Sequence, residues 1–331
     1  MRTGLSRAGR HRVTKAIALP ALLLIVLAGH AGDQDLTAKQ EHDPGSFRIA
    51  VDVALVVLHA TVTDRQGGFV SGLAEKDFRV YEDGVPQPIR LFVTEDLSVT
   101  VGLVVDHSTT MIPKMEEVLA AARTFVRASN RQDEMFVVNF NEKVSLGLPS
   151  TMRFSDSSSE LQRAIGNAPV EGQTALYDAI AKALIELQAG TRDRKVLIVI
   201  SDGGDNASAH TLTQVMKLAG QSSAVIYTVG LFDEGDPERN PAVLKSLALA
   251  TGGEAFLPQH YRDVVGISER IARDIRHQYT IGYVPLKRAR DGAYHAIRVH
   301  AETTGRDKLS VRTRTGYVAG EGPRTVQKDA K

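Results

Sequence analysis

The chain contains no cysteine among its 331 residues. This absence excludes disulfide bonds, thiolate metal sites, a cysteine nucleophile and lipidation at a cysteine. The sequence also lacks the Gly-x-Ser-x-Gly, His-Glu-x-x-His and glycine-rich phosphate-binding motifs of common enzyme classes, and its histidines show no metal-ligand spacing. Together these absences predict a protein that is not an enzyme.

Acidic residues are absent from the first 31 residues, which contain five Lys/Arg. This basic region precedes an uncharged run, Ala16–Ala28, and then small residues, an order typical of a secretory signal peptide over residues 1–31. The run is shorter than the roughly 18 to 20 apolar residues of a membrane-spanning helix, so an uncleaved anchor is the less favoured alternative. No later segment is long and apolar enough to span a bilayer. We therefore expect an exported protein of the periplasm, the cell surface or the extracellular space, and the lack of disulfides is typical of bacterial proteins there.

Acidic residues slightly outnumber basic ones in the rest of the chain. Removal of the five basic residues of the signal changes the formal net charge from +1 to −4. A mildly acidic protein is a poor candidate for binding nucleic acid, so we expect no nucleic-acid partner.

Two β-rich segments flank the middle of the chain. A polar leader, 32–46, precedes residues 47–97, where Ile49, Val51, Val53, Leu55 and Val57 alternate along one predicted strand face. Residues 277–319 contain three more strand-like stretches, at 279–284, 295–300 and 309–313. Because three strands alone make a poor core, we expect them to pack with 47–97 as one β-sandwich. The polar tail, 320–331, is expected to be disordered.

The middle of the chain, 98–276, alternates predicted strands with amphipathic helices. Apolar runs at 99–105, 135–138, 196–200 and 224–229 are typical of parallel strands buried on both faces. The pattern predicts an α/β fold in which a doubly wound, mostly parallel sheet of Rossmann-like type is inserted between the two β segments. In such sheets ligands bind beyond the carboxyl ends of the strands.

Two carboxylates and three hydroxyls lie at the predicted strand and helix ends. They are the side chains of Asp106, Ser108, Thr110, Thr174 and Asp202. Hard oxygen ligands suit Mg²⁺, Mn²⁺ or Ca²⁺, so these residues predict a divalent metal site. Taken singly, the two aspartates are also explained as helix caps, and Thr174 as the N-cap of a helix beginning at Ala175. The first strand ends without a glycine-rich turn, which disfavours a dinucleotide-binding enzyme.

Other polar residues near these motifs have more ordinary interpretations. We expect His107 to be exposed, or to lie beside the metal ligands without being one of them. Asp178 and Asp205 are expected to form local hydrogen bonds. The acidic stretch with Asp233, Glu234, Asp236 and Glu238 is more readily explained as a solvated loop than as a calcium site.

Three segments, 106–110, 172–178 and 196–203, resemble the metal-ion-dependent adhesion site of von Willebrand factor type A domains. The wider layout, which includes 63–73, 77–84 and 278–283, resembles von Willebrand A-related exported proteins of acidobacteria. The resemblance implies that Ser108 and Thr110 bind the metal directly and that Thr174 binds it directly or through water. It further implies that Asp106 and Asp202 hold metal-bound waters.

The favoured function is an exported, metal-dependent, adhesion-type module in which Mg²⁺, or else Mn²⁺ or Ca²⁺, bridges to a Glu or Asp carboxylate of a partner protein. One alternative is a metal-assisted hydrolase, for which His107 is the only nearby candidate base. The other is a structural envelope protein with a vestigial metal site.

Overall fold

The computed structural model describes residues 55–319 except 234, 236–238, 287–291 and 304–307. The predicted signal peptide, leader and tail, and the strand pattern up to Val53, lie outside the described residues. Among the helices of the described part, none has both the length and the apolar character needed to cross a membrane.

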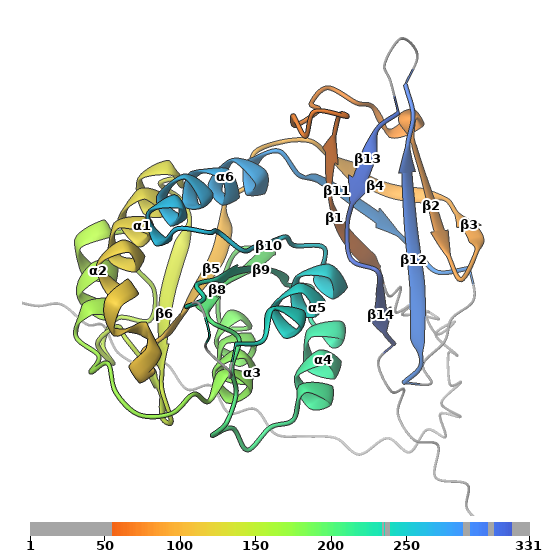
Figure 1. Ribbon diagram of the computed structural model, residues 1–331. Helices are drawn as coiled ribbons and strands as arrows, with labels where there is room; N and C mark the ends of the chain where they lie inside the picture. The colour runs from red at the N-terminus through yellow and green to blue at the C-terminus, as the bar shows by residue number, and fades with distance from the viewer. Residues whose placement is uncertain (1–54, 234, 236–238, 287–291, 304–307, 320–331) are drawn as a thin grey trace, which may run out of the picture. The chain divides into compact units, whose positions relative to one another are not determined.

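A six-stranded sheet forms the α/β part, in the order β10-β9-β8-β5-β6-β7 (Figure 1). Its five parallel strands are β5 (Val99–Asp106), β6 (Glu134–Phe140), β8 (Arg194–Ser201), β9 (Val225–Gly230) and β10 (Ala255–Phe256). The short β7 (Val144–Leu146) pairs antiparallel at one edge. All eight residues of β5 are buried, as expected for a central parallel strand. The predicted doubly wound sheet is confirmed, while the short β7 and β10 were not predicted.

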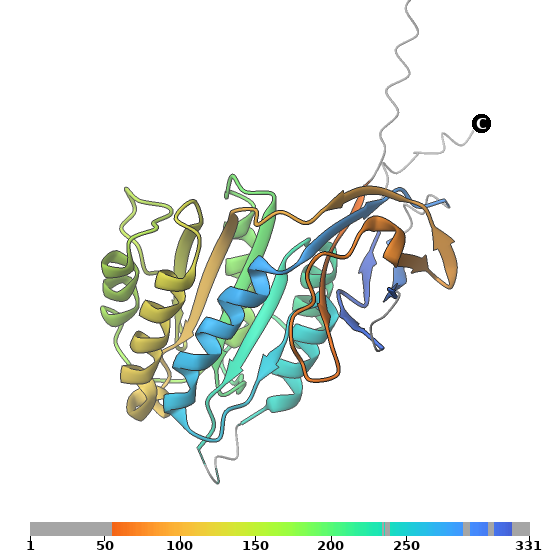
Figure 2. The ribbon, with the colours of Figure 1, turned by 90° about the horizontal axis from the view of Figure 1, so that it is seen from above.

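Helices cover the sheet on both faces. They are α1 (Met115–Ala128), α2 (Ser158–Gly166), α3 (Leu176–Leu187), α4 (Leu212–Gln221), α5 (Pro241–Thr251) and α6 (Val264–Arg276), with short 3₁₀ helices η1 (Glu75–Asp77), η2 (Thr109–Lys114) and η3 (Tyr261–Asp263). Helix α1 packs against α2 and α6, whereas α3 packs against α4, and α4 against α5. Figure 2 shows β5 running between α1 and α6 on one side and α3 on the other.

Gly102 lies where the central strand is most tightly packed. A Cβ atom built on Gly102 would lie 2.6 Å from Leu197 Cδ2 and 2.6 Å from Phe136 Cζ. We expect Gly102→Ala to lower the free energy of unfolding by about 1–3 kcal/mol, because both neighbours belong to a filled core. Urea unfolding followed by circular dichroism measures the change. Gly266→Ala in α6 is the control of opposite sign: its added Cβ meets no atom within 4 Å, and alanine favours a helix. Equal stability of the two variants would contradict the prediction.

Two four-stranded antiparallel sheets form the second part of the fold. One has the order β13-β1-β11-β4 and the other β14-β12-β2-β3. The first contains β1 (Val56–Thr63), β4 (Ile89–Val93), β11 (Tyr279–Tyr283) and β13 (Ser310–Arg312); the second contains β2 (Phe78–Glu82), β3 (Val85–Gln87), β12 (Tyr294–Ala301) and β14 (Gly316–Val318). Residues of both sheets share one hydrophobic core. Each sheet combines strands from before and after the α/β part, as predicted for a β-sandwich.

Of the residues that alternate along the predicted strand face, the two that the structure describes, Leu55 and Val57, do not enter the sandwich core. The residues of β1 that enter the sandwich core are Leu58, Ala60 and Val62, whereas Leu55 is 43% exposed. The residues between them, His59 and Thr61, are buried as well. Helix α6 covers this second face, where Thr61 Oγ1 donates to Asp274 Oδ1 at 2.6 Å. Local alternation therefore did not reveal which face of β1 is the core face, since both faces are covered.

Strand β4 contains a shift of register that changes which of its side chains face the core. Ile89 and Phe92 pack against the sandwich core, whereas Leu91 is 36% exposed. Leu91 pairs with Gly282 and Ile89 pairs with Tyr283, so the register shifts between these pairs. Such a bulge moves the following side chains to the opposite face of the strand.

Three arginines, one from the α/β part and two from the sandwich segment, donate to carbonyl groups at helix C-termini of the α/β part. Arg194 Nη2 donates to Ile275 O of α6 at 2.6 Å, Arg312 Nη1 to Gly252 O after α5 at 2.6 Å, and Arg314 Nη2 to Gly220 O of α4 at 2.7 Å. Cations are favourable at helix C-termini, where the last carbonyl groups lack partners inside the helix. Arg194 begins β8, so these contacts lie at the opposite end of that strand from Asp202.

Candidate metal site

Backbone contacts hold the three predicted motif loops together. Thr109 N and Thr109 Oγ1 both donate to Gly172 O, at 3.2 and 3.1 Å. Asn206 N donates to Thr174 O at 3.0 Å, and Thr174 N donates to Asn206 Oδ1 at 2.9 Å. The loop after β5 is thus joined to the loop before α3, which is joined in turn to the loop after β8.

Hydrogen bonds connect four of the five predicted ligands. Ser108 N donates to Asp106 Oδ1 at 2.8 Å, and Ser201 Oγ donates to Asp106 Oδ2 at 2.6 Å. Ser108 Oγ lies 3.1 Å from Thr110 Oγ1, which donates to Asp202 Oδ2 at 2.7 Å. The structure therefore gathers these oxygens at the carboxyl ends of β5 and β8, where the fold places a ligand.

Ser201 is a member of this network that sequence reasoning missed. It is the last residue of β8 and is fully buried. Its hydroxyl bonds Asp106 and also accepts from Gly203 N at 3.0 Å. The only sequence signal was a polar residue ending an apolar strand, directly before Asp202.

The two carboxylates of the site are buried and have no cationic partner among the described residues. Asp106 is 0% exposed and Asp202 is 2% exposed, and neither forms an ion pair with another described residue. Burial raises the pKa of Asp106 to about 6, although hydrogen bonds from Ser108 and Ser201 oppose the rise and the charge of Asp202 adds to it. Buried carboxylates normally need a neutralising partner. This donor set of carboxylate and hydroxyl oxygens fits a divalent cation of the Mg²⁺ type.

The helix-cap explanations of the predicted ligands are wrong. The N-cap of α3 is Ala175 rather than Thr174, and it makes no side-chain capping bond. The N-caps after β5 and β8 are Ser108, for η2, and Thr211, for α4. Neither aspartate caps a helix, and their described bonds are to neighbouring loop groups instead.

His107 was expected either to be exposed or to lie beside the metal ligands, and the first of these two positions is wrong. The residue is 1% exposed; its Nδ1 lies 3.1 Å from Val105 O and its Nε2 lies 2.9 Å from Ile165 O. Both ring nitrogens are therefore engaged by backbone carbonyl groups. A base that activates water needs a nitrogen facing that water, so His107 does not serve the hydrolase alternative in this geometry.

The neighbouring aspartates have local roles, as expected. Asp178 accepts from Ala209 N at 2.9 Å and from His210 N at 2.8 Å, and Asp205 Oδ1 accepts from Ser208 Oγ at 2.6 Å. In the acidic stretch, Asp233 Oδ2 lies 2.9 Å from Nζ of the buried Lys114. The other three acidic residues of that stretch, Glu234, Asp236 and Glu238, lie outside the described residues.

A second group of metal-ligating side chain types occurs in the sandwich. Glu82, Asp83 and His295 offer ligand atoms that all lie within 4.8 Å of one another. Asp83 Oδ2 lies 2.8 Å from His295 Nδ1, and Tyr283 OH donates to Glu82 Oε2 at 2.5 Å. Only the pairing of β2 with β12 brings these residues together, so the sequence held no local signal for the group.

A family model described as the von Willebrand factor type A domain matches residues 100–270, slightly more than half of the chain. Similar solved structures include "von Willebrand factor type A from Catenulispora acidiphila", 12% identical over 82% of this chain and 74% of that chain, with a TM-score of 0.49. The vWF domain of the type V pili tip protein Mfa5 from Porphyromonas gingivalis is 14% identical over 54% of this chain and 95% of that chain, with a TM-score of 0.46. An aerotolerance-related membrane protein from Bacteroides fragilis is 14% identical over 54% and 98%, with a TM-score of 0.44. No curated protein matches the sequence.

Proposed function

Because the chain belongs to the von Willebrand factor type A domain family, we propose that it is a non-enzymatic module that binds a partner protein through a divalent cation. The proposed metal site consists of polar side chains at the carboxyl edge of the sheet, with hydroxyl ligands from Ser108, Thr110 and Thr174 and outer carboxylates from Asp106 and Asp202. The main support is the burial of two carboxylates that have no basic partner among the described residues. The proposed metal-binding domain spans residues 98–276, between β segments 47–97 and 277–319.

Existing hydrogen bonds orient the hydroxyl ligands for a cation. The Thr110 hydroxyl donates its proton to Asp202, which leaves its oxygen lone pairs as acceptors. Ser108 Oγ lies beside it at 3.1 Å. Outer carboxylates that fix ligands in this way raise metal affinity, so the proposed role of Asp106 and Asp202 is to orient hydroxyls and metal-bound waters.

Such a site leaves the cation electron-poor. If hydroxyls and waters supply most of the direct ligands, little of the cation's charge is neutralised by the protein itself. A small hard cation then favours an additional anionic oxygen. We therefore propose that a Glu or Asp carboxylate of the partner completes the coordination shell. The signal-like residues 1–31 support the further proposal that this contact is made outside the cytoplasm.

The first test is metal binding by the full chain. We expect calorimetric titration with Mg²⁺ or Mn²⁺, at about pH 7.5 so that Asp106 is ionised, to show one saturable site. Asp106→Ala should weaken binding by about 10–100-fold or more, the usual effect of removing a group that orients metal ligands. Asp193→Ala, which removes an exposed carboxylate at the other end of β8, is the matched control and should bind as the unmodified chain does.

Circular dichroism shows whether each variant is folded, and Asp106→Asn, which keeps the side-chain shape, repeats the test if the alanine variant is not. Equal heats from the unmodified chain and a folded Asp106 variant would contradict the ligand assignment. Metal binding without any Mg²⁺-dependent capture of a carboxylate-bearing partner would favour a structural envelope protein. Capture that EDTA abolishes, that Mg²⁺ restores and that Thr174→Ala weakens would support the bridged mechanism.

A further inference from the structure

A block of cationic and aromatic side chains covers the outer face of the second sandwich sheet. The antiparallel register of β2 and β12 places Arg79 opposite His300 and Tyr81 opposite Arg298. The intervening residues of both strands enter the sandwich core, so these four side chains project from the other face. Arg79, Arg298 and His300 are exposed and Tyr81 is half-buried. We call these four residues the β2–β12 face.

The β2–β12 face is positively charged, whereas the chain as a whole beyond residue 31 has a negative net charge. The four residues include two guanidinium groups and no carboxylate, whereas the chain beyond residue 31 has a formal net charge of −4. Among the described residues, neither Arg79 nor Arg298 forms an ion pair. Arg79 Nη1 donates to Lys76 O and Phe78 O, both at 2.8 Å, which holds its guanidinium in place. Ordered guanidinium groups that form no ion pair among the described residues favour an anionic partner.

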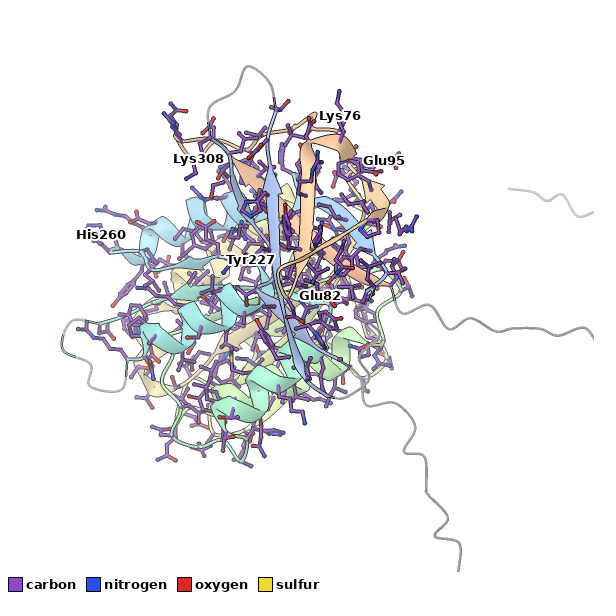
Figure 3. All side chains as sticks on the ribbon, turned by 90° about the vertical axis from the view of Figure 1, so that its right-hand side faces the viewer. Lys76, Glu82, Glu95, Tyr227, His260 and Lys308 are labelled. Atoms are coloured by element: carbon purple, nitrogen blue, oxygen red, sulfur yellow. The ribbon has the colours of Figure 1, made fainter. Side chains whose placement is uncertain are left out.

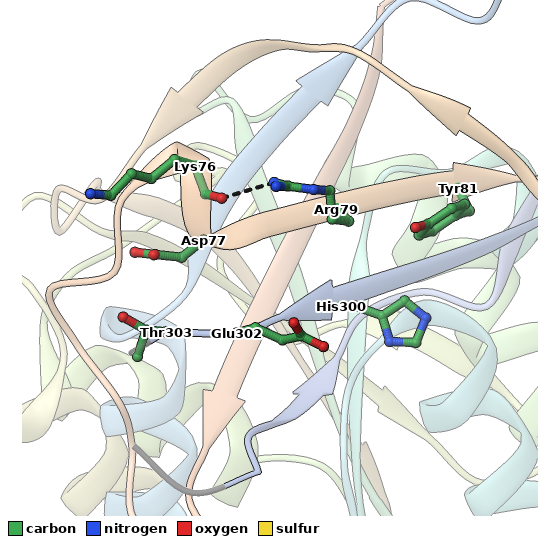
Figure 4. Close-up of a pocket in the computed structure, with 7 residues that line it drawn as sticks. All are labelled: Lys76, Asp77, Arg79, Tyr81, His300, Glu302 and Thr303. Carbon is green, nitrogen blue, oxygen red and sulfur yellow. Dashed lines mark hydrogen bonds between the residues drawn. The ribbon is translucent and has the colours of Figure 1, made fainter. Parts of the chain in front are cut away.

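The face is hollowed at one end, where η1 leads into β2 (Figure 4). The hollow has a volume of about 670 Å³, and Arg79, Tyr81 and His300 line it together with Lys76. Figure 3 labels Lys76 and Glu82 near opposite ends of β2, and the lining residues of the hollow run along this strand from Lys76 to Tyr81. The Tyr81 and His300 rings are 5.7 Å apart and nearly perpendicular. Two acidic residues, Asp77 and Glu302, also line the hollow, and Asp77 Oδ2 is engaged by Ala74 N at 2.8 Å.

The lining separates two classes of anionic partner. Its described lining residues are charged or polar, and none of them has an aliphatic side chain. Protein partners usually anchor large side chains in well-packed, desolvated pockets, whereas charged groups line this hollow beside its two aromatic rings. A strongly hydrated polymer of sugar rings that carry carboxylates matches it better. Arginine binds carboxylates bidentately, and aromatic rings pack against the apolar faces of sugars.

We propose that the β2–β12 face binds an acidic polysaccharide, with Arg79 and Arg298 pairing with its carboxylates and with Tyr81 and His300 lying against its sugar rings. This binding uses none of the proposed metal ligands and goes beyond the metal-bridged function. Binding to the polysaccharide is therefore expected to persist in EDTA, which abolishes metal-bridged partner binding. An experiment in EDTA thus tests this proposal independently of the proposed metal-bridged function.

The test measures binding of the full chain to immobilised oligogalacturonate at low salt in the presence of EDTA. We expect the double variant Arg79→Gln/Arg298→Gln to bind about tenfold more weakly or worse, because two charge-assisted contacts are lost. The double variant Arg123→Gln/Arg127→Gln removes two exposed arginines from α1 and is the matched control for net charge. Tyr81→Ala is expected to weaken binding with no change in charge. Circular dichroism melting checks that each variant is folded.

Three further probes separate the classes of ligand. Neutral dextran should not bind, and poly-L-glutamate and duplex DNA should bind much more weakly than oligogalacturonate. Equal binding of poly-L-glutamate would overturn the sugar assignment in favour of an acidic peptide, and equal binding of DNA would show attraction by charge alone. The proposal is also overturned if the unmodified chain does not bind oligogalacturonate, or if the two double variants bind equally.

Discussion

Replacement of Arg312 by leucine is expected to lower the free energy of unfolding by about 3–5 kcal/mol, the usual cost of breaking a buried ion pair from one side. Arg312 of β13 pairs with Asp274 of α6, whose side chain is 1% exposed. The same guanidinium bonds Gly252 O at 2.6 Å, and Asp274 also accepts from Thr61. Without Arg312, a buried carboxylate would lose its cation where the sandwich meets the α/β part. Urea unfolding of the full chain measures the loss.

Two further variants separate this effect from a general loss of charge. Arg276→Leu breaks a more exposed pair, in which Arg276 Nη1 lies 3.2 Å from Asp96 Oδ2, and should cost at most about 1 kcal/mol. Arg312→Leu/Asp274→Leu replaces the whole buried pair by apolar groups and should recover much of the stability. The prediction fails if Arg312→Leu is no more destabilising than Arg276→Leu.

Acidification is expected to destabilise the protein through His59. Burial, followed by the charges of Arg194 and Arg314, lowers the pKa of His59 to about 3, so the folded state keeps the imidazole neutral. In the unfolded chain the pKa is about 6.5, so below that pH only the unfolded state binds this proton. Stability is therefore lost as the pH falls from about 6.5 towards 3, by about 1.4 kcal/mol per pH unit.

The prediction is measured as a difference between two proteins. His59→Gln should remove this contribution, so the free energies of unfolding of the unmodified chain and of the variant should diverge by about 2 kcal/mol between pH 6.5 and about 5. Other titrating groups, such as Asp106, whose raised pKa acts in the opposite direction, cancel in the comparison. His260→Gln, at an exposed position, is the control. Parallel pH profiles for the unmodified chain and His59→Gln would refute the role of His59.

Much of the α/β fold was predictable from local pattern. The apolar run that became β5 is long enough to identify a strand buried on both faces, and all of its residues are buried. The run that became β8 has the same character and ends one residue before Asp202. Parallel strands have their carboxyl ends at the same edge of the sheet. The positions of Asp106 and Asp202 at the ends of these two runs were therefore enough to predict that the two carboxylates lie at the same edge.

Features that depend on contacts between residues far apart in the sequence could not be predicted from local pattern. Alternation in β1 did not show which face enters the sandwich core, because α6 covers the other face through Asp274. The contact of the buried His107 ring with Ile165 O depends on helix α2, which follows later in the chain. The group of Glu82, Asp83 and His295 exists only through the pairing of β2 with β12.

By itself, then, the sequence determined the doubly wound sheet, the β segments that flank it and the oxygen-bearing residues at its carboxyl edge. These features depend on short-range periodicity and on positions at strand ends, which a linear pattern carries. The tertiary structure alone decided that Ser201 bonds Asp106, that His59 stays buried beside Arg194, and that Arg312 and Arg314 reach helix C-termini. The physical reason is that hydrogen bonds, desolvation and Coulomb interactions depend on distances in space, which chain folding sets between residues far apart in sequence.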